Sequence, residues 1–133
     1  MGLLDAPRSK IRSFTDLKSW KEGHGLVVLT YRITAKFPRS ELYSLTDQMR
    51  RAASSVTANI AEGFGRRSYK EKIQFYYHSQ GSLTELKDHI LTAKDIGYLN
   101  EDDLRSLAES ANMTHRLLQG LITKSKSFLN LKS

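Results

Sequence analysis

Apolar and polar residues alternate along this chain with the period of a helix rather than that of a strand. Away from the prolines and the glycine-containing turns, apolar residues recur at every third or fourth position, which places them on one face of an α-helix. Four such segments joined by short connections predict an all-α fold, an antiparallel up-down-up-down four-helix bundle. We expect the bundle over residues 14–129, after a flexible basic arm over residues 1–13 and before a C-terminal tail over residues 130–133.

The first predicted helix begins near Thr15 or Asp16 and ends before Pro38, because the residue before a proline avoids the helical conformation. Gly23 and Gly25 fall inside this helix, where each costs about 1 kcal/mol relative to alanine. Close approach by a neighbouring helix would explain them. The face that we expect to be buried comprises Leu17, Trp20, His24, Val27, Tyr31 and Ala35.

The second predicted helix has Ser40 as its N-cap, since serine is a favoured residue at that position. Gly63 and Gly65 are expected to end it in left-handed geometry or to open the turn that follows. Its core stripe comprises Leu42, Leu45, Met49, Ala53, Val56 and Ile60, and a stripe of small residues beside it comprises Ser54, Ala58 and Ala61. Small side chains let helix axes approach closely, so we expect this helix to be packed on more than one side.

The third and fourth predicted helices carry capping signals. Ser68 followed by Glu71 matches the capping box, and Gly97 lies just past the expected end of the third helix near Asp95. Asn100 is the expected N-cap of the fourth helix, whose acidic first turn complements the helix dipole. The core faces comprise Ile73, Tyr76, Gln80, Leu83, Leu86 and Ile90 in the third helix, and Leu104, Leu107, Ala111, Leu118, Leu121 and Ile122 in the fourth.

The formal net charge of +7 is unevenly distributed along the chain. Residues 50–72 contain six basic side chains against Glu62 and Glu71, whereas residues 82–110 contain seven acidic side chains against three basic ones. One part of the molecule can therefore attract polyanions while another part repels them, or the two parts can attract each other between subunits.

The residues provide no recognised catalytic or metal-binding motif. The chain has no cysteine, and its four histidines lack the spacing of a metal site. An all-α ribonuclease of the HEPN type would need an arginine shortly before a histidine. Only Lys72 and His78 have about that spacing here, and a lysine ammonium cannot form the bidentate phosphate contact of an arginine guanidinium. We expect no enzymatic activity, no cofactor and no metal.

Membrane insertion and export are also not expected. The longest unbroken apolar run is Leu26–Leu29, far below the roughly 20 residues that a membrane-spanning helix needs. No targeting signal is evident in the first 13 residues, and the lack of cysteine agrees with a reducing compartment. We therefore expect a cytoplasmic protein.

Arg50 and Arg51 lie within the second predicted helix, where adjacent residues point about 100° apart. We expect one of them to be partly buried and both to serve architecture, as ion pairs that set helix register or a subunit contact. The candidate partners are Glu62 and Glu85, and Asn59 is a candidate for a buried polar link. Binding of an anion is the alternative for this pair.

Arg66, Arg67, Lys70 and Lys72 are predicted to contact nucleic-acid phosphates. They follow two glycines and enter the first turns of the third helix, where backbone N–H groups already favour an anion. Aromatic side chains are interleaved with these cations and could stack on unpaired bases, or could instead fill the core or an oligomer interface. These aromatic residues are Phe64, Tyr69, Phe75, Tyr76 and Tyr77.

Several segments resemble the family of four-helix-bundle proteins encoded in intervening sequences of bacterial 23S ribosomal RNA genes. The resemblance runs over roughly residues 14–122 and includes Phe14-x-Asp16-Leu17-x-x-Trp20, the stretch from Gln48 to Arg66, Phe75, the segment 81–86 and the Gly97-Tyr98 loop. Tyr77-His78-Ser79 departs from the pattern, where small or apolar residues are expected.

The resemblance implies an antiparallel four-helix bundle without enzymatic activity. The family is similar to a pentameric accessory protein of diversity-generating retroelements that binds a reverse transcriptase and nucleic acid. By that likeness the chain would form a homopentamer and bind RNA or a ribonucleoprotein. The alternative is a protein-interaction adaptor whose basic surface docks an acidic partner protein such as a reverse transcriptase.

Overall fold

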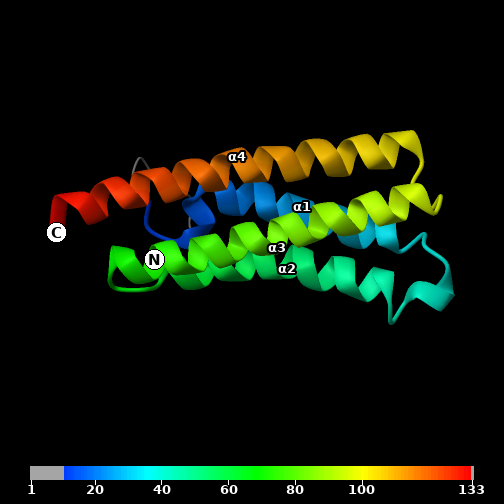
Figure 1. Cartoon of the computed structure of the whole chain (residues 1–133), viewed down its shortest axis with the longest axis horizontal. Helices are drawn as coiled ribbons and strands as arrows, with labels where there is room; N and C mark the ends of the chain where they lie inside the picture. The colour runs from blue at the N-terminus through cyan, green and yellow to red at the C-terminus, as the bar shows by residue number, and fades with distance from the viewer. Residues whose placement is uncertain (1–10, 133) are drawn as a thin grey trace.

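Four long helices form the molecule. The structure, a computed structural model, describes residues 11–132, and the side chains of residues 11–129. Its α-helices are α1 (Lys18–Thr34), α2 (Leu45–Phe64), α3 (Tyr69–Asp95) and α4 (Glu101–Lys132), and the short 3-10 helices η1 (Phe14–Asp16) and η2 (Arg39–Glu41) precede α1 and α2. The α-helices lie side by side with connections at alternating ends (Figure 1). Each packs against its neighbour in the chain, and α4 also packs against α1, so the all-α four-helix prediction is confirmed.

The expected N-terminal arm and C-terminal tail compare differently with the structure. Residues 1–10 of the expected basic arm lie outside the described residues. At the other end, α4 continues to Lys132, so the backbone is helical through most of the segment that we expected to be a tail. Within residues 11–132, no helix is both long and apolar enough to cross a membrane.

The core consists mainly of the apolar stripes expected for the last three helices. Fully buried side chains from these helices include Met49, Val56, Ile60, Leu83, Leu86, Leu107, Leu118 and Ile122. Leu42 is an exception, because it lies outside α2 and is exposed.

The face predicted for α1 is wrong by about one residue. The buried positions are Ser19, Gly23, Leu26, Thr30, Ile33 and Thr34, whereas His24, Tyr31 and Ala35 are exposed. Leu17, Trp20 and Val27 are half-buried and pack at the edge of the core.

Threonine and glycine can occupy the core face of α1 for identifiable reasons. The hydroxyls of Thr30 and Thr34 donate to the carbonyl oxygens four residues earlier, each at 2.7 Å, so their burial leaves no unpaired donor. A Cβ atom on Gly23 would lie 3.1 Å from the Thr57 side chain of α2. The close helix approach that we expected to explain the glycines therefore occurs at Gly23, while Gly25 is exposed.

The start of α2 also differs from the prediction. Ser40 belongs to η2, and α2 begins at Leu45 with Ser44 as N-cap. The capping interaction comes from Glu41, whose Oε1 accepts a hydrogen bond from the Leu45 amide at 3.3 Å and whose Oε2 accepts one from the Tyr98 hydroxyl at 2.8 Å. A carboxylate thus provides the acceptor that the sequence pattern assigned to a serine.

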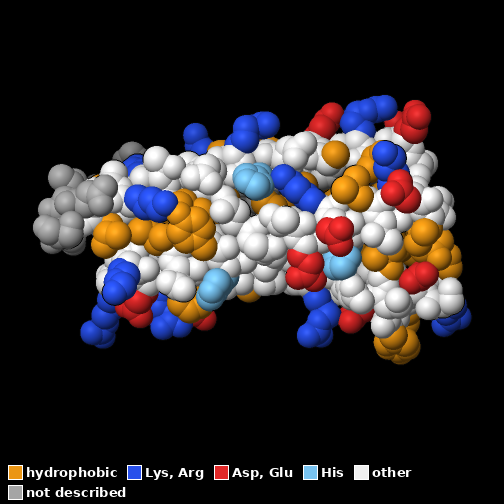
Figure 2. All heavy atoms as spheres, in the orientation of Figure 1, with side chains coloured by type: hydrophobic (Ala, Val, Ile, Leu, Met, Phe, Trp, Pro, Cys, Tyr) orange, Lys and Arg blue, Asp and Glu red, His pale blue; other side chains and the backbone are white. Residues whose placement is uncertain are grey.

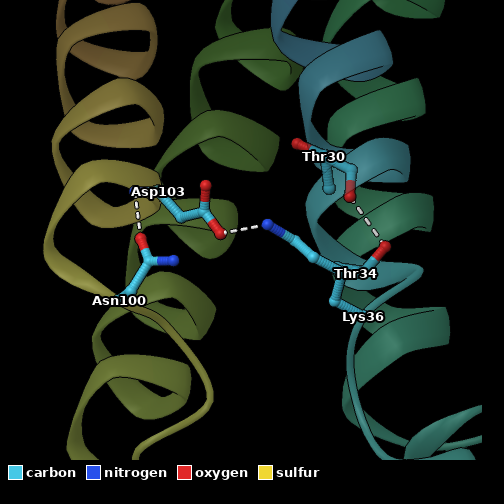
Figure 3. A network of polar contacts seen from close by, with 5 residues as sticks. All are labelled: Thr30, Thr34, Lys36, Asn100 and Asp103. Carbon is cyan, nitrogen blue, oxygen red and sulfur yellow. Dashed lines mark hydrogen bonds and ion pairs between the residues drawn. The ribbon is translucent and has the colours of Figure 1, made fainter.

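The N-caps predicted for α3 and α4 are confirmed, although the capping box of α3 is incomplete because the Glu71 carboxylate accepts from the Ser68 hydroxyl rather than from its backbone amide. The Ser68 hydroxyl accepts a hydrogen bond from the Glu71 amide at 3.2 Å, and the Asn100 side chain accepts one from the Asp103 amide at 2.7 Å. Asp103 also pairs with Lys36 beyond the end of α1, at 2.6 Å (Figure 3). This ion pair joins the first turn of α4 to the segment that follows α1.

Candidate nucleic-acid interface

The connection between α2 and α3 is tight because α3 approaches the last turn of α2 closely. A Cβ atom on Gly63 would lie 2.7 Å from Cε1 of Tyr76 and 3.0 Å from Cβ of Phe75. Gly65 has a φ of −77° in the right-handed region, so the left-handed ending of α2 is wrong and the alternative expectation, that a glycine opens the turn, holds for Gly65. Gly63 is needed for its lack of a side chain, and the four residues 65–68 complete the turn.

Arg66 is engaged within the protein. One of its terminal nitrogens lies 3.2 Å from Oε2 of Glu62, and its guanidinium carbon lies 4.5 Å from the centre of the Phe75 ring. This ion pair is largely exposed, so it adds little stability, but it reduces the charge that Arg66 can offer to a phosphate. Glu62 therefore contacts Arg66 and not Arg50 or Arg51, the partners expected for it.

Lys72 is also engaged within the protein. Its ammonium donates a hydrogen bond of 2.6 Å to the backbone oxygen of Phe64 and lies 5.3 Å from the Phe64 ring. Burial lowers the pKa of Lys72. The oxygen of Phe64 is one of the carbonyls left without a helical partner at the C-terminus of α2, so Lys72 stabilises this helix end.

Arg67 and Lys70 remain free for a ligand. Both side chains are exposed, and none of the hydrogen bonds or ion pairs among the described side chains involves either residue. The four cations predicted as one site thus divide into two that have internal partners and two that face solvent.

The C-terminal half of α4 adds two lysines that the sequence pattern did not assign to the site. Phe128 and Tyr69 have ring centres 5.1 Å apart, and the Lys126 ammonium lies 5.1 Å from the Tyr77 ring. These contacts lay the end of α4 along the start of α3, which brings Lys124 and Lys126 to the same end of the bundle as Arg67. The antiparallel order of helices was the sequence signal that could have located them.

We call the cations Arg66, Arg67, Lys70, Lys72, Lys124 and Lys126 the basic end. Four of them, Arg67, Lys70, Lys124 and Lys126, are exposed. On the face seen in Figure 2, most acidic side chains lie in the half of the molecule that holds the α3–α4 connection. On this face, most acidic side chains therefore lie away from the basic end.

The aromatic residues of this region have different environments. Tyr76 is only 2% exposed, and burial raises its pKa to about 12; it is a core residue and cannot stack on a ligand. Phe75 is half-buried beneath Arg66, whereas Tyr77 is exposed apart from its contact with Lys126. Tyr69 and Phe64 are half-buried next to Lys72.

Arg50 joins α2 to the C-terminus of α1. Its Nε donates to the Thr34 hydroxyl at 2.9 Å, a terminal nitrogen donates to the Tyr31 oxygen at 3.4 Å, and its guanidinium lies over the Tyr31 ring. A positive charge is favourable at this helix end. Neither Glu62 nor Glu85 is its partner, and Arg51 is exposed.

The remaining polar candidates lie between α2 and α3. The Asn59 amide donates to the oxygen and the hydroxyl of Ser55, at 2.9 and 3.0 Å. The Ser55 hydroxyl in turn lies 2.8 Å from the Ser82 hydroxyl, so a half-buried polar link connects the two helices. Glu85 lies 3.3 Å from His89 on its own helix.

The sequence of the chain matches the profile of the 23S rRNA-intervening sequence proteins over residues 15–120. The chain belongs to this family. A solved structure from Bacteroides thetaiotaomicron, described as a protein of unknown function from the S23 ribosomal protein family, is similar in fold. It has a TM-score of 0.70 and 16% identity over 78% of this chain and 97% of that chain. A comparison with curated proteins finds no match.

Proposed function

We propose that the protein is a non-enzymatic binding module that contacts RNA phosphates through the basic end. The observation that carries this proposal is the convergence of Arg67 and Lys70, next to the α2–α3 turn, with Lys124 and Lys126 of α4. Clustered exposed cations attract a polyanion at long range and displace its counterions when it binds. Membership of a family named for intervening sequences of 23S rRNA supports RNA as the nucleic acid.

The structure suggests which cations to test. Arg66 and Lys72 have internal partners, so replacing them would disturb the turn as well as remove charge. The informative variant replaces Arg67, Lys70, Lys124 and Lys126 with glutamine. A matched control replaces Arg32, Arg39, Lys94 and Arg105 with glutamine, which removes the same charge from the other end of the bundle.

Binding should be measured by fluorescence anisotropy with a labelled single-stranded RNA over a series of salt concentrations. We expect the basic-end variant to bind more weakly, and we expect the slope of its salt dependence to fall by about 0.7 for each phosphate that it no longer neutralises. The control should retain the affinity and the salt dependence of the wild type. Wild-type protein without affinity at moderate salt, or equally weakened binding in both variants, would refute RNA binding through this end and leave the acidic protein partner as the function to test.

We also propose that the chain self-associates, as a pentamer by its resemblance to the retroelement accessory protein. Exposed apolar side chains support self-association because they are costly to leave in water. Several lie at the end opposite the basic end, among them Leu42, Leu91, Ile96 and Tyr43, which is 92% exposed. Light scattering should give the mass of a pentamer, and the mass of a monomer would contradict the proposal.

A further inference from the structure

A pocket of about 220 Å³ opens at the basic end. Its walls come from the segment before α1, the end of α2, the start of α3 and the C-terminal half of α4. Four aromatic residues line it, namely Phe64, Tyr69, Tyr76 and Phe128, together with Leu17 and Leu121. Pockets for drug-sized molecules usually measure about 300–1,000 Å³, so this one suits a single flat ring system.

Two amines give the pocket its polarity. Lys72 and Lys124 belong to its lining, and the described lining residues include no carboxylate. The Lys72 ammonium donates one hydrogen bond to the Phe64 oxygen, and an ammonium group has three N–H donors. It can therefore offer further donors to a carbonyl oxygen or a ring nitrogen inside the pocket.

The surroundings of the pocket favour an occupant that is part of a longer anion. Lys70 is next to the lining residue Tyr69, and Lys126 is close in sequence to Lys124 and Phe128. Near the C-terminal end of α4, Figure 2 shows a hydrophobic patch with a basic side chain against it. A small amphipathic anion would use one amine at the rim, whereas a polynucleotide would use the pocket and the cations outside it.

We infer that this pocket receives one unpaired base of the bound RNA, while the neighbouring phosphates lie on Lys70, Lys124 and Lys126. Of the aromatic walls, Phe64, Tyr69 and Phe128 provide stacking partners that accept any base, and the Lys72 ammonium donates to acceptors on its edge. This inference rests on the proposed function and deepens it. It predicts a preference for single-stranded RNA over a blunt duplex, whose bases are already paired and stacked.

Two substitutions test the pocket without changing the net charge. Ser125→Leu adds apolar volume at a lining position, and Phe128→Ala removes an aromatic wall. Ser106→Leu, on the exposed surface of α4 at the other end of the bundle, is the matched control. Circular dichroism on each variant establishes that the helical bundle is retained.

Affinities for a single-stranded RNA and for a blunt duplex with the same number of phosphates separate the two proposals. We expect both pocket variants to bind the single strand about five- to hundredfold more weakly, the range for removing one base stack. Their affinity for the duplex should remain that of the wild type. Equal weakening for both RNAs, or unchanged affinity for the single strand, would overturn the pocket inference while RNA binding itself stands.

A measurement on the wild-type protein avoids dependence on the variants. A single-stranded RNA that carries a fluorescent adenine analogue should lose emission on binding, because the analogue stacks on aromatic rings in the pocket. Unchanged emission with the RNA fully bound would assign the pocket to another occupant, such as a segment of the chain itself, and overturn the inference. Failure of the wild type to bind any RNA would instead refute the proposed function.

Discussion

Gly63 offers a direct test of how α2 and α3 are joined, through the substitution Gly63→Ala. The new Cβ atom would lie 2.7 Å from Cε1 of Tyr76, 3.0 Å from its Cδ1 and 3.0 Å from Cβ of Phe75. Tyr76 is buried in the core, and Cβ of Phe75 moves only with the backbone of α3. Neither the Tyr76 ring nor Cβ of Phe75 can move away without a cost in free energy, so α2 and α3 must separate locally.

Two opposing free energies decide the outcome of Gly63→Ala. Overpacking a well-packed site typically costs about 1–3 kcal/mol, and the short distances favour the upper part of that range. Alanine recovers at most about 1 kcal/mol of helix propensity, and less here because Gly63 is next to the last residue of α2. We expect the free energy of unfolding to fall by about 1–2 kcal/mol.

The same substitution elsewhere in the bundle should have the opposite sign. A Cβ atom on Gly81, within α3, would meet nothing within 4 Å, so Gly81→Ala should raise the free energy of unfolding by about 0.5–1 kcal/mol. Gly23→Ala, with its 3.1 Å contact, should lie between the two. Urea unfolding followed by circular dichroism at equal protein concentration measures all three variants. A Gly63→Ala protein as stable as Gly81→Ala would show that the predicted clash between α2 and α3 is wrong.

Two further predictions concern side chains that link helices. Arg50→Ala should lower the free energy of unfolding by about 1–2 kcal/mol by removing the charged hydrogen bond to Thr34, whereas exposed Arg51→Ala should change it by less than about 0.5 kcal/mol; equal effects would contradict the role given to Arg50. Burial, together with Lys87 at 3.1 Å, lowers the pKa of His115 below its ordinary 6.5. The unfolded chain therefore protonates His115 more readily than the folded protein does. As a result, the free energy of unfolding should be highest above pH 6.5 and should fall as the pH drops through the lowered pKa. His115→Gln should lose less stability over that range than the wild type, and an identical pH dependence would argue against the effect.

Much of the bundle was predictable because its signals are local or periodic. Ser68 and Asn100 cap the helices that they were expected to cap, because each side chain reaches an amide only three residues away. The core stripes of α2, α3 and α4 followed from apolar residues at helical spacing. In α1 the predicted apolar residues Leu17, Trp20 and Val27 lie at the edge of the core, whereas Gly23 and Thr30 are buried together with Leu26 and Ile33. The prediction from apolar spacing therefore misplaced the buried face of α1 by about one residue.

The candidate site was predicted in part. The α2–α3 turn does carry Arg67 and Lys70 on the surface, but Arg66 and Lys72 have partners within the protein. Sequence spacing could suggest Glu62 as a partner of Arg66 four residues away. It could not reveal that the Lys72 ammonium folds back onto the oxygen of Phe64, because that contact depends on the geometry of the turn.

The sequence by itself determined the helical class, the order of the four helices, most of their caps and the separation of charge along the chain. These properties depend on side-chain type and on separations of a few residues, both of which can be read directly from the sequence. Only the tertiary structure decided which face of α1 is buried, which cations remain exposed, and that the end of α4 joins the α2–α3 turn around an aromatic pocket. Those outcomes depend on how closely the helices approach and which side chains then meet, and residues as distant in sequence as Tyr69 and Phe128 come together only when the bundle closes.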